Sequence, residues 1–91
     1  MSVYEKPSNI KISLKNSREA IFLNTKTNKE WTYTKKPIVE ISALFEKHPQ
    51  WRNSQIAKRL HISEAEVIGL VKPLIKKGHL SELGKKEILF D

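Results

Sequence analysis

The sequence predicts an α+β domain of 91 residues, in which a β-rich N-terminal segment precedes three helices and a C-terminal β-hairpin. Three observations lead to this class. Apolar and polar residues alternate in the first third of the chain, which is typical of strands. After Pro37 the apolar residues recur at the three- and four-residue spacing of helices. Gly78 then ends the helical pattern, and two short strand-like runs follow it.

The first 36 residues form the predicted β-rich extension of the domain. Ile10, Ile12 and Leu14 alternate with polar residues, which places three apolar side chains on one face of a strand. Residues 20–24 and 30–34 are β-prone and are joined by turn-forming residues, so they predict a hairpin. A small sheet needs another surface to cover its apolar face. That surface is either the helical part of the chain or a partner protein, and the residues predicted to contact a partner are Ile10, Ile12, Leu14, Trp31 and Tyr33.

Residues 37–91 form the predicted helical domain. Ile38, Ile41, Leu44 and Phe45 make an apolar stripe at helical spacing, and this first helix ends at His48. Residues 51–53 predict a very short strand. A second helix then begins at a polar capping residue, either position 53 or position 54, and runs to about position 60.

The third helix has the clearest start in the chain. Ser63 and Glu66 have the spacing of a capping box, in which the Ser63 hydroxyl accepts from the Glu66 amide and the Glu66 carboxylate accepts from the Ser63 amide. Gly78 predicts a left-handed C-terminal cap. Pro73 lies inside this helix and removes the hydrogen bond to the Gly69 carbonyl. We expect either a kink between Gly69 and Pro73, or a helix that ends early and restarts.

The stretch from residue 53 to residue 80, NSQIAKRLHISEAEVIGLVKPLIKKGHL, resembles the helix-turn-helix of regulators related to the leucine-responsive and multiple-antibiotic-resistance repressors. Ala57 is small where the two helix backbones approach each other, and Ile56, Leu60 and Val67 occupy core positions. The sequence departs from the family at His61, where glycine is usual because the turn needs a positive φ. The resemblance covers residues 38–90 and implies a winged helix-turn-helix domain with a β-hairpin wing at residues 79–90.

The resemblance further implies that the third helix enters the major groove of DNA and that the wing contacts the backbone. The net charge of +7, from 17 basic and 10 acidic residues, favours a polyanionic partner. Glu64 and Glu66, however, lie at the end of the helix that would read the bases, and they repel phosphates. Binding is therefore predicted to be largely electrostatic. The predicted DNA-binding residues are Arg52, Ser54, Gln55, Lys58, Arg59, Ser63, Glu66, Lys72, Lys76, Lys85 and Lys86.

Two functions remain open from the sequence. The first is a small duplex-DNA-binding protein, such as a transcription regulator. The second is a non-catalytic accessory subunit of a replication or transcription complex, which would bind a larger protein through the winged helix and the N-terminal strands. Lysines also flank the aromatic residues Trp31 and Tyr33. This pattern is found in proteins that bind single-stranded nucleic acid, whose bases stack on the aromatic rings. It is also found where the aromatic residues pack on the protein's own core.

The chain shows no signature of an enzyme. Its three histidines, at positions 48, 61 and 79, are scattered, and it has no cysteine, no metal-ligand spacing and no glycine-rich phosphate loop. The sequence therefore predicts no catalysis, no cofactor, no metal and no small-molecule substrate. No stretch reaches the ~18 apolar residues that span a bilayer, and the N-terminus lacks the apolar segment of a signal peptide. The predicted location is the cytoplasm.

Overall fold

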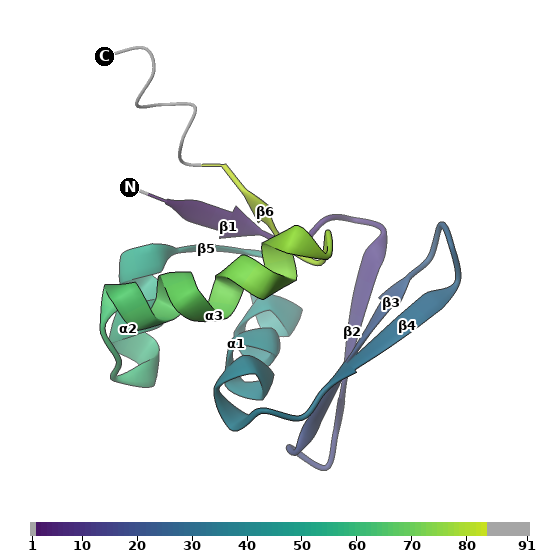
Figure 1. Cartoon of the computed structure of the whole chain (residues 1–91), viewed down its shortest axis with the longest axis horizontal. Helices are drawn as coiled ribbons and strands as arrows, with labels where there is room; N and C mark the ends of the chain where they lie inside the picture. Colours follow the sequence, from purple (N-terminus) through teal and green to yellow (C-terminus); the bar gives the residue numbers. More distant parts are fainter. Residues whose placement is uncertain (1, 84–91) are drawn as a thin grey trace.

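The computed structural model describes residues 2–83, and this part of the chain forms six strands and three helices (Figure 1). Four strands precede the first helix. Their bounds and those of the following elements are β1 (Val3–Glu5), β2 (Ile10–Lys15), β3 (Glu19–Asn24), β4 (Lys29–Tyr33), α1 (Lys36–Lys47), β5 (Gln50–Arg52), α2 (Asn53–Leu60), α3 (Glu64–Lys76) and β6 (Ser81–Glu82).

Strands β2, β3 and β4 form an antiparallel sheet in which consecutive strands are neighbours. The turn between β2 and β3 places both Asn16 (φ 54°) and Ser17 (φ 57°) in the left-handed region. The loop has three residues, 16–18, because Lys15 pairs with Glu19; positive φ at both central positions of a β-turn gives a twist that matches that of the flanking strands. The turn is closed by a 3.1 Å hydrogen bond from the Arg18 amide to the Lys15 carbonyl. The predicted strand over residues 10–14 and the predicted hairpin that follows it are confirmed.

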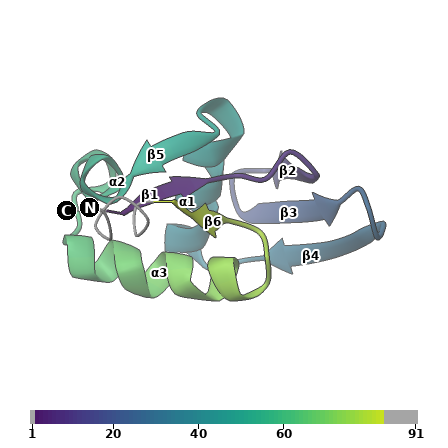
Figure 2. The same cartoon turned by 90° about the horizontal axis from the view of Figure 1, so that it is seen from above.

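A second, separate sheet has the strand order β5, β1, β6. The central strand β1 is antiparallel to both neighbours, and its Tyr4 stands opposite Trp51 on one side and Glu82 on the other. Seen from above, this sheet lies over α1 and alongside α3, while the β2–β3–β4 sheet extends away from the helices (Figure 2). The N-terminal strand therefore joins two segments, β5 and β6, that are separated in the sequence by α2 and α3.

The predicted winged helix-turn-helix layout is wrong, although the α+β class holds. The structure has four strands before the helices and two separate small antiparallel sheets. The strand that follows α3 pairs with β1 from the N-terminus, through Tyr4↔Glu82 and Glu5↔Ser81. The strand β6, which the sequence predicted as the first strand of a C-terminal hairpin, thus pairs with a strand from the N-terminus. The remainder of the predicted hairpin, residues 84–90, lies outside the described residues.

The helix ends follow the local signals in the sequence. His61 has φ 57°, and the Ile62 amide donates to the Ala57 carbonyl at 3.1 Å, as the short turn after α2 requires. Gly78 has φ 79° and forms the left-handed cap after α3. The helix α3 is continuous through Pro73, so the predicted alternative of a helix that ends early and restarts is wrong. Pro73 is exposed, and open space surrounds the Cα of Gly69 where a side chain would lie.

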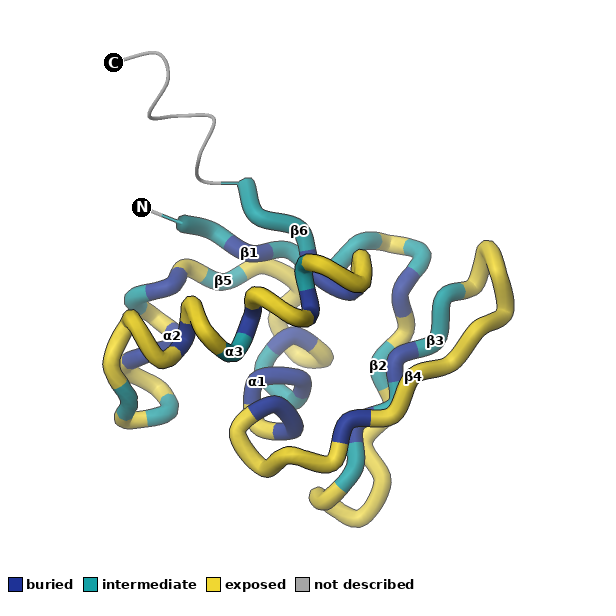
Figure 3. The backbone as a smooth tube through the Cα atoms, in the orientation of Figure 1, coloured by how far each residue is buried: buried dark blue, intermediate teal, exposed yellow. Residues whose placement is uncertain are grey.

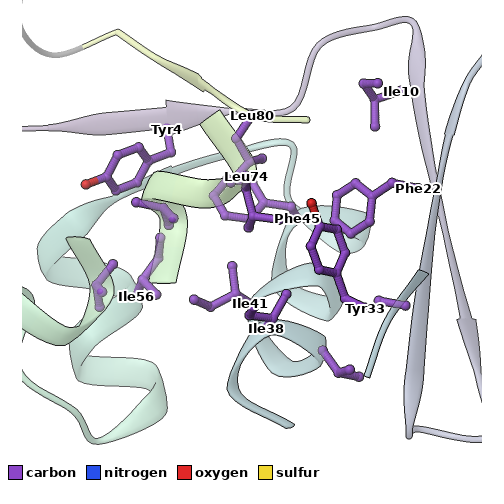
Figure 4. Close-up of a cluster of buried hydrophobic side chains, with 14 of the residues drawn as sticks. Tyr4, Ile10, Phe22, Tyr33, Ile38, Ile41, Phe45, Ile56, Leu74 and Leu80 are labelled. Carbon is purple, nitrogen blue, oxygen red and sulfur yellow. The ribbon is translucent and has the colours of Figure 1, made fainter. Parts of the chain in front are cut away.

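A single hydrophobic cluster fills the space between the helices and both sheets (Figure 4). The burial pattern in Figure 3 shows the same division, with buried residues facing inward and the outer turns of α2 and α3 exposed. The face of the β2–β3–β4 sheet that carries Ile10, Phe22 and Tyr33 therefore packs on the protein's own helices. The buried apolar residues are Tyr4, Ile10, Ala20, Phe22, Tyr33, Ile38, Val39, Ile41, Phe45, Ile56, Ala57, Val67, Val71, Leu74 and Leu80.

Candidate nucleic-acid interface

The outer face of β5 and α2 gathers three of the seven basic residues that the sequence assigned to DNA contact, namely Arg52, Lys58 and Arg59. The inner face of α2 is fixed to the core by Ile56 and Ala57, so the helix turns Lys58 and Arg59 outward, where both are exposed. Arg52 is the last residue of β5 and is also exposed. The packing of α2 on the core and the pairing of β5 with β1, where Arg52 stands opposite Val3, therefore set the direction of these three cations.

Gln55 is held in a fixed place on the same face. Its side-chain Oε1 accepts a hydrogen bond from the Arg52 amide at 3.0 Å, which satisfies a backbone donor at the start of α2. The side-chain amide nitrogen of Gln55 has no partner within residues 2–83, and it supplies donors on the surface. The Arg52 guanidinium and the Gln55 amide thus stand at the N-terminal end of α2.

Trp51 forms the centre of this face. It is half-buried, and its ring lies 5.2 Å from the ring of His48 between centroids. Two shallow grooves meet at Trp51, one of about 270 Å³ and one of about 320 Å³. No acidic side chain lines either groove within the described residues, and Glu5, which pairs with Gln50 in the sheet, lies outside both linings. The two linings together are Val3, Gln50, Trp51, Arg52, Gln55, Lys58, Arg59 and Leu83.

The other predicted DNA-binding residues lie elsewhere. Ser63 and Glu66 form the N-terminal cap of α3, where the Glu66 amide donates to the Ser63 hydroxyl at 3.1 Å. The Glu66 carboxylate accepts from the same hydroxyl at 3.4 Å, in place of the predicted bond from the Ser63 amide. Lys72 and Lys76 line a different groove beside α3. Ser54 is half-buried and lines neither groove at Trp51, while positions 85 and 86, the predicted contacts Lys85 and Lys86, lie outside the described residues.

The N-terminal end of α3, which carries Glu64 and Glu66, also connects α3 to α2. The Asn53 side-chain amide donates to the Glu64 carboxylate at 3.3 Å, which ties the first residue of α2 to the first residue of α3. Asn53 itself is 7% exposed, and its backbone N–H donates to the Ser2 carbonyl at 2.9 Å. Glu64 therefore has a role in holding the two helices, besides its favourable position near the positive end of the α3 dipole.

The residues that the sequence assigned to partner contact divide into two groups. Ile10 and Tyr33 are 0% and 8% exposed and belong to the protein's own core, and Ile12 is half-buried against it. Assigning these three to a partner surface was wrong, because α1 already covers the face of the sheet that carries them. Leu14 and Trp31 remain exposed, at 39% and 47%.

Sequence reasoning missed a group of residues around the end of α3. His79 is 8% exposed; its Nδ1 is 2.8 Å from the Tyr33 hydroxyl, and its ring stacks on Phe22 at 4.9 Å between centroids. Burial and, to a smaller extent, the charge of Lys77 lower the pKa of His79, so the ring is neutral at pH 7. Burial also raises the pKa of Tyr33 to about 12. Lys77 places its Nζ 3.5 Å from the centroid of the Trp31 ring.

Sequence reasoning also missed Trp51, although the sequence held a signal for it. Trp51 is adjacent to Arg52, and an aromatic residue beside a basic one is typical of nucleic-acid-binding surfaces. The contact between Lys77 and Trp31 gave no such signal, because it depends on how α3 meets the sheet.

Comparisons of the chain with protein-family models, with curated protein sequences and with solved structures found no match. Within residues 2–83 there is no group of three or more His, Cys, Asp and Glu residues placed to hold a metal ion. Among the helices of the same part of the chain, none combines the length and the apolar character needed to cross a membrane.

Proposed function

We propose that this protein binds nucleic acid, with duplex DNA as the principal partner, through the outer face of β5 and α2. One observation carries the proposal: Arg52, Lys58 and Arg59 converge on Trp51 and Gln55 around two grooves whose described linings contain no acidic side chain. Guanidinium groups pair with phosphate oxygens through two parallel hydrogen bonds, and an ammonium acts as a compact positive charge. Such a face fits a phosphate backbone.

The proposed binding is electrostatic and largely independent of base sequence. Phosphate contacts position a protein on DNA but carry no direct sequence information. The residues best suited to base reading, arginine and glutamine, lie at positions 52 and 55, whereas the start of α3 presents Glu64 and Glu66. The proposal does not require catalysis or a cofactor. A cytoplasmic location remains a prediction of the sequence alone.

Charge reversal on α2 tests the proposal. Lys58→Glu combined with Arg59→Glu should weaken binding to a short duplex by at least about tenfold at low salt, and should lower the slope of log K against log [salt] by about 2. Fluorescence anisotropy of a labelled duplex measures both quantities. The matched control is Lys11→Glu with Lys15→Glu, which makes the same change of net charge on exposed positions of β2. Equal losses in the two variants would mean that net charge alone, and not the α2 face, determines binding.

A second candidate function, protein binding as an accessory subunit, is favoured by one separate observation. A groove of about 610 Å³ lies between α3 and the β5–β1–β6 sheet, with Ile68 at its wall, and Ile68 is 49% exposed. Lys72 and Lys76 flank the apolar residues of this groove and outnumber its one described carboxylate, that of Glu82, which suits an acidic, amphipathic partner segment. This candidate is tested by affinity purification of the wild type and of Ile68→Glu from the cells that make the protein, and the proteins that co-purify with each are compared. A partner that binds this groove should be lost from Ile68→Glu. A partner that is retained equally by both proteins does not use this groove.

A further inference from the structure

Trp31 presents an aromatic ring to solvent at the far end of the β2–β3–β4 sheet. It is 47% exposed although it stands opposite the buried Phe22 in the register of β3 and β4. Residues directly opposite in an antiparallel pair share a face of the sheet. Trp31 therefore lies on the same face of the sheet as Phe22, but 47% of its side chain remains exposed; most of the β4 backbone is coloured as exposed in Figure 3.

A groove of about 540 Å³ opens beside this ring, between the sheet and the end of α3. Two cations line it, Lys29 from β4 and Lys77 from the end of α3. One carboxylate, that of Glu30, also belongs to the lining, and the remaining lining residues are Asn24, Thr27, Trp31 and His79. The groove thus combines an exposed aromatic surface with positive charge on two sides of it.

His79 adds a polar group to the floor of this groove. It is 8% exposed and lines the groove, and its Nδ1 is engaged with the Tyr33 hydroxyl at 2.8 Å. The second ring nitrogen, Nε2, has no hydrogen-bond partner within residues 2–83. In a neutral imidazole one nitrogen donates and the other accepts. Nε2 is therefore available to either an acceptor or a donor of a bound molecule, depending on which nitrogen carries the proton.

We propose that this groove is a second nucleic-acid site, in which an unpaired base of a single strand stacks on Trp31, while Lys29 and Lys77 bind the flanking phosphates. An exposed aromatic ring beside a positively charged groove is the arrangement by which single-stranded nucleic acid is bound without sequence preference. The Nε2 atom of His79 supplies a hydrogen bond to the edge of the stacked base.

The Lys77 ammonium, which now lies 3.5 Å from the centre of the Trp31 ring, does not prevent stacking. Lys77 is exposed, and a cation–aromatic contact at an exposed site is weaker than the stacking of a base on the same ring. A base can therefore replace the ammonium over the ring, and the released Lys77 then neutralises a phosphate. Before the ligand arrives, the same contact holds the indole in place.

This inference extends the proposed function to unpaired bases, but it rests on different residues. In both views of the molecule, β4 and α2 lie at opposite ends with α1 between them (Figures 1 and 2). The two sites can therefore be disabled separately. A protein with both sites would contact a duplex at one end and an unpaired strand at the other.

Quenching of Trp31 fluorescence by a short single strand tests the inference. Trp51→Phe leaves Trp31 as the only tryptophan, because the chain has two. Titration with oligothymidylate of about eight nucleotides should quench this fluorescence, whereas an abasic deoxyribose-phosphate oligomer of equal length should bind more weakly and leave it unquenched. Equal quenching by both oligomers would overturn the inference, because it would show a response to phosphate alone.

Three variants complete the design. Trp31→Leu should weaken oligothymidylate binding by about tenfold, measured by anisotropy, while Trp31→Phe retains most of it; circular dichroism checks that each variant is folded. The Lys58→Glu, Arg59→Glu double variant should lose duplex affinity and keep the quenching of Trp31. If it keeps duplex affinity as well, the proposed function fails and this inference stands. If Trp31→Leu binds the single strand as tightly as the wild type, the inference fails and the proposed function stands.

Discussion

Replacing Phe22 by alanine tests whether the N-terminal sheet and the helices unfold as one unit. Phe22 lies on β3, is 1% exposed, and contacts two residues from different parts of the chain. Its ring meets Tyr33 edge-on at 5.2 Å and stacks on His79 at 4.9 Å. Since His79 follows α3, the Phe22 side chain connects the sheet to the end of the helical segment.

The expected loss of stability is large for a protein of this size. A buried Phe→Ala substitution typically costs about 3–5 kcal/mol, because transfer energy is lost and a cavity remains. At the usual stability per residue, a chain of 91 residues has a free energy of unfolding of roughly 5–14 kcal/mol. Phe22→Ala should therefore lower Tm by about 15–30 °C. Ile68→Ala is the control, because Ile68 is 49% exposed and its truncation should cost less than about 1 kcal/mol.

The assay needs one probe in each sheet. Trp51→Phe leaves Trp31 on β4 as the reporter, and Trp31→Phe leaves Trp51 on β5. In each background, urea unfolding is followed by fluorescence with and without Phe22→Ala. If there is one core, both reporters should show the same reduced midpoint. A transition at Trp51 that does not move while the transition at Trp31 does would refute the reasoning, because the two parts would then unfold independently.

Three further predictions concern local structure. Gly78→Ala should destabilise the folded protein by about 1–2 kcal/mol, because Gly78 has φ 79°. Gly69→Ala should instead stabilise the folded protein by about 0.5–1 kcal/mol, because Gly69 lies in α3 and open space surrounds it. Thermal unfolding of the two variants checks both predictions. Ser63→Ala should cost about 1 kcal/mol because the Glu66 amide loses its acceptor, and Ser63→Asp should recover most of this in the same assay. Since burial lowers the pKa of His79 below its ordinary value of 6.5, the unfolded chain binds that proton more readily. The contribution of the neutral ring to stability is complete above about pH 6.5 and is lost as pH falls below that value. Urea titrations from pH 7.5 to about 4.5 should therefore show that the free energy of unfolding declines less in His79→Asn than in the wild type.

The elements that the sequence predicted correctly are those with signals in neighbouring residues. The capping residue Ser63 and the left-handed residues His61 and Gly78 mark helix ends within a few positions of the chain, and the structure places the ends there. Alternation of apolar and polar residues likewise identified β2. Arg52, Lys58 and Arg59, three of the residues predicted to bind DNA, lie near one another in the structure because β5 leads directly into α2.

The features that the sequence missed depend on contacts between distant segments. β1 spans three residues, Val3–Glu5, which is too short to show a period, so its pairing with both β5 and β6 could not be predicted. Ile10 and Tyr33 were assigned to a partner because the sequence did not show that α1 covers them. The Lys77–Trp31 contact joins positions 46 apart in the sequence, and no local pattern predicts it.

Chemical-shift mapping with a short DNA duplex tests the central claim most directly. Amide resonances of a uniformly ¹⁵N-labelled sample are followed as the duplex is added at low salt, where electrostatic binding is strongest. The proposed interface predicts that the largest changes cluster at residues 50–59, with the side-chain amide of Gln55 among them. Changes centred instead on the start of α3 at Ser63–Glu66, or spread evenly over all exposed lysines, would contradict the assignment of β5 and α2 as the nucleic-acid-binding face.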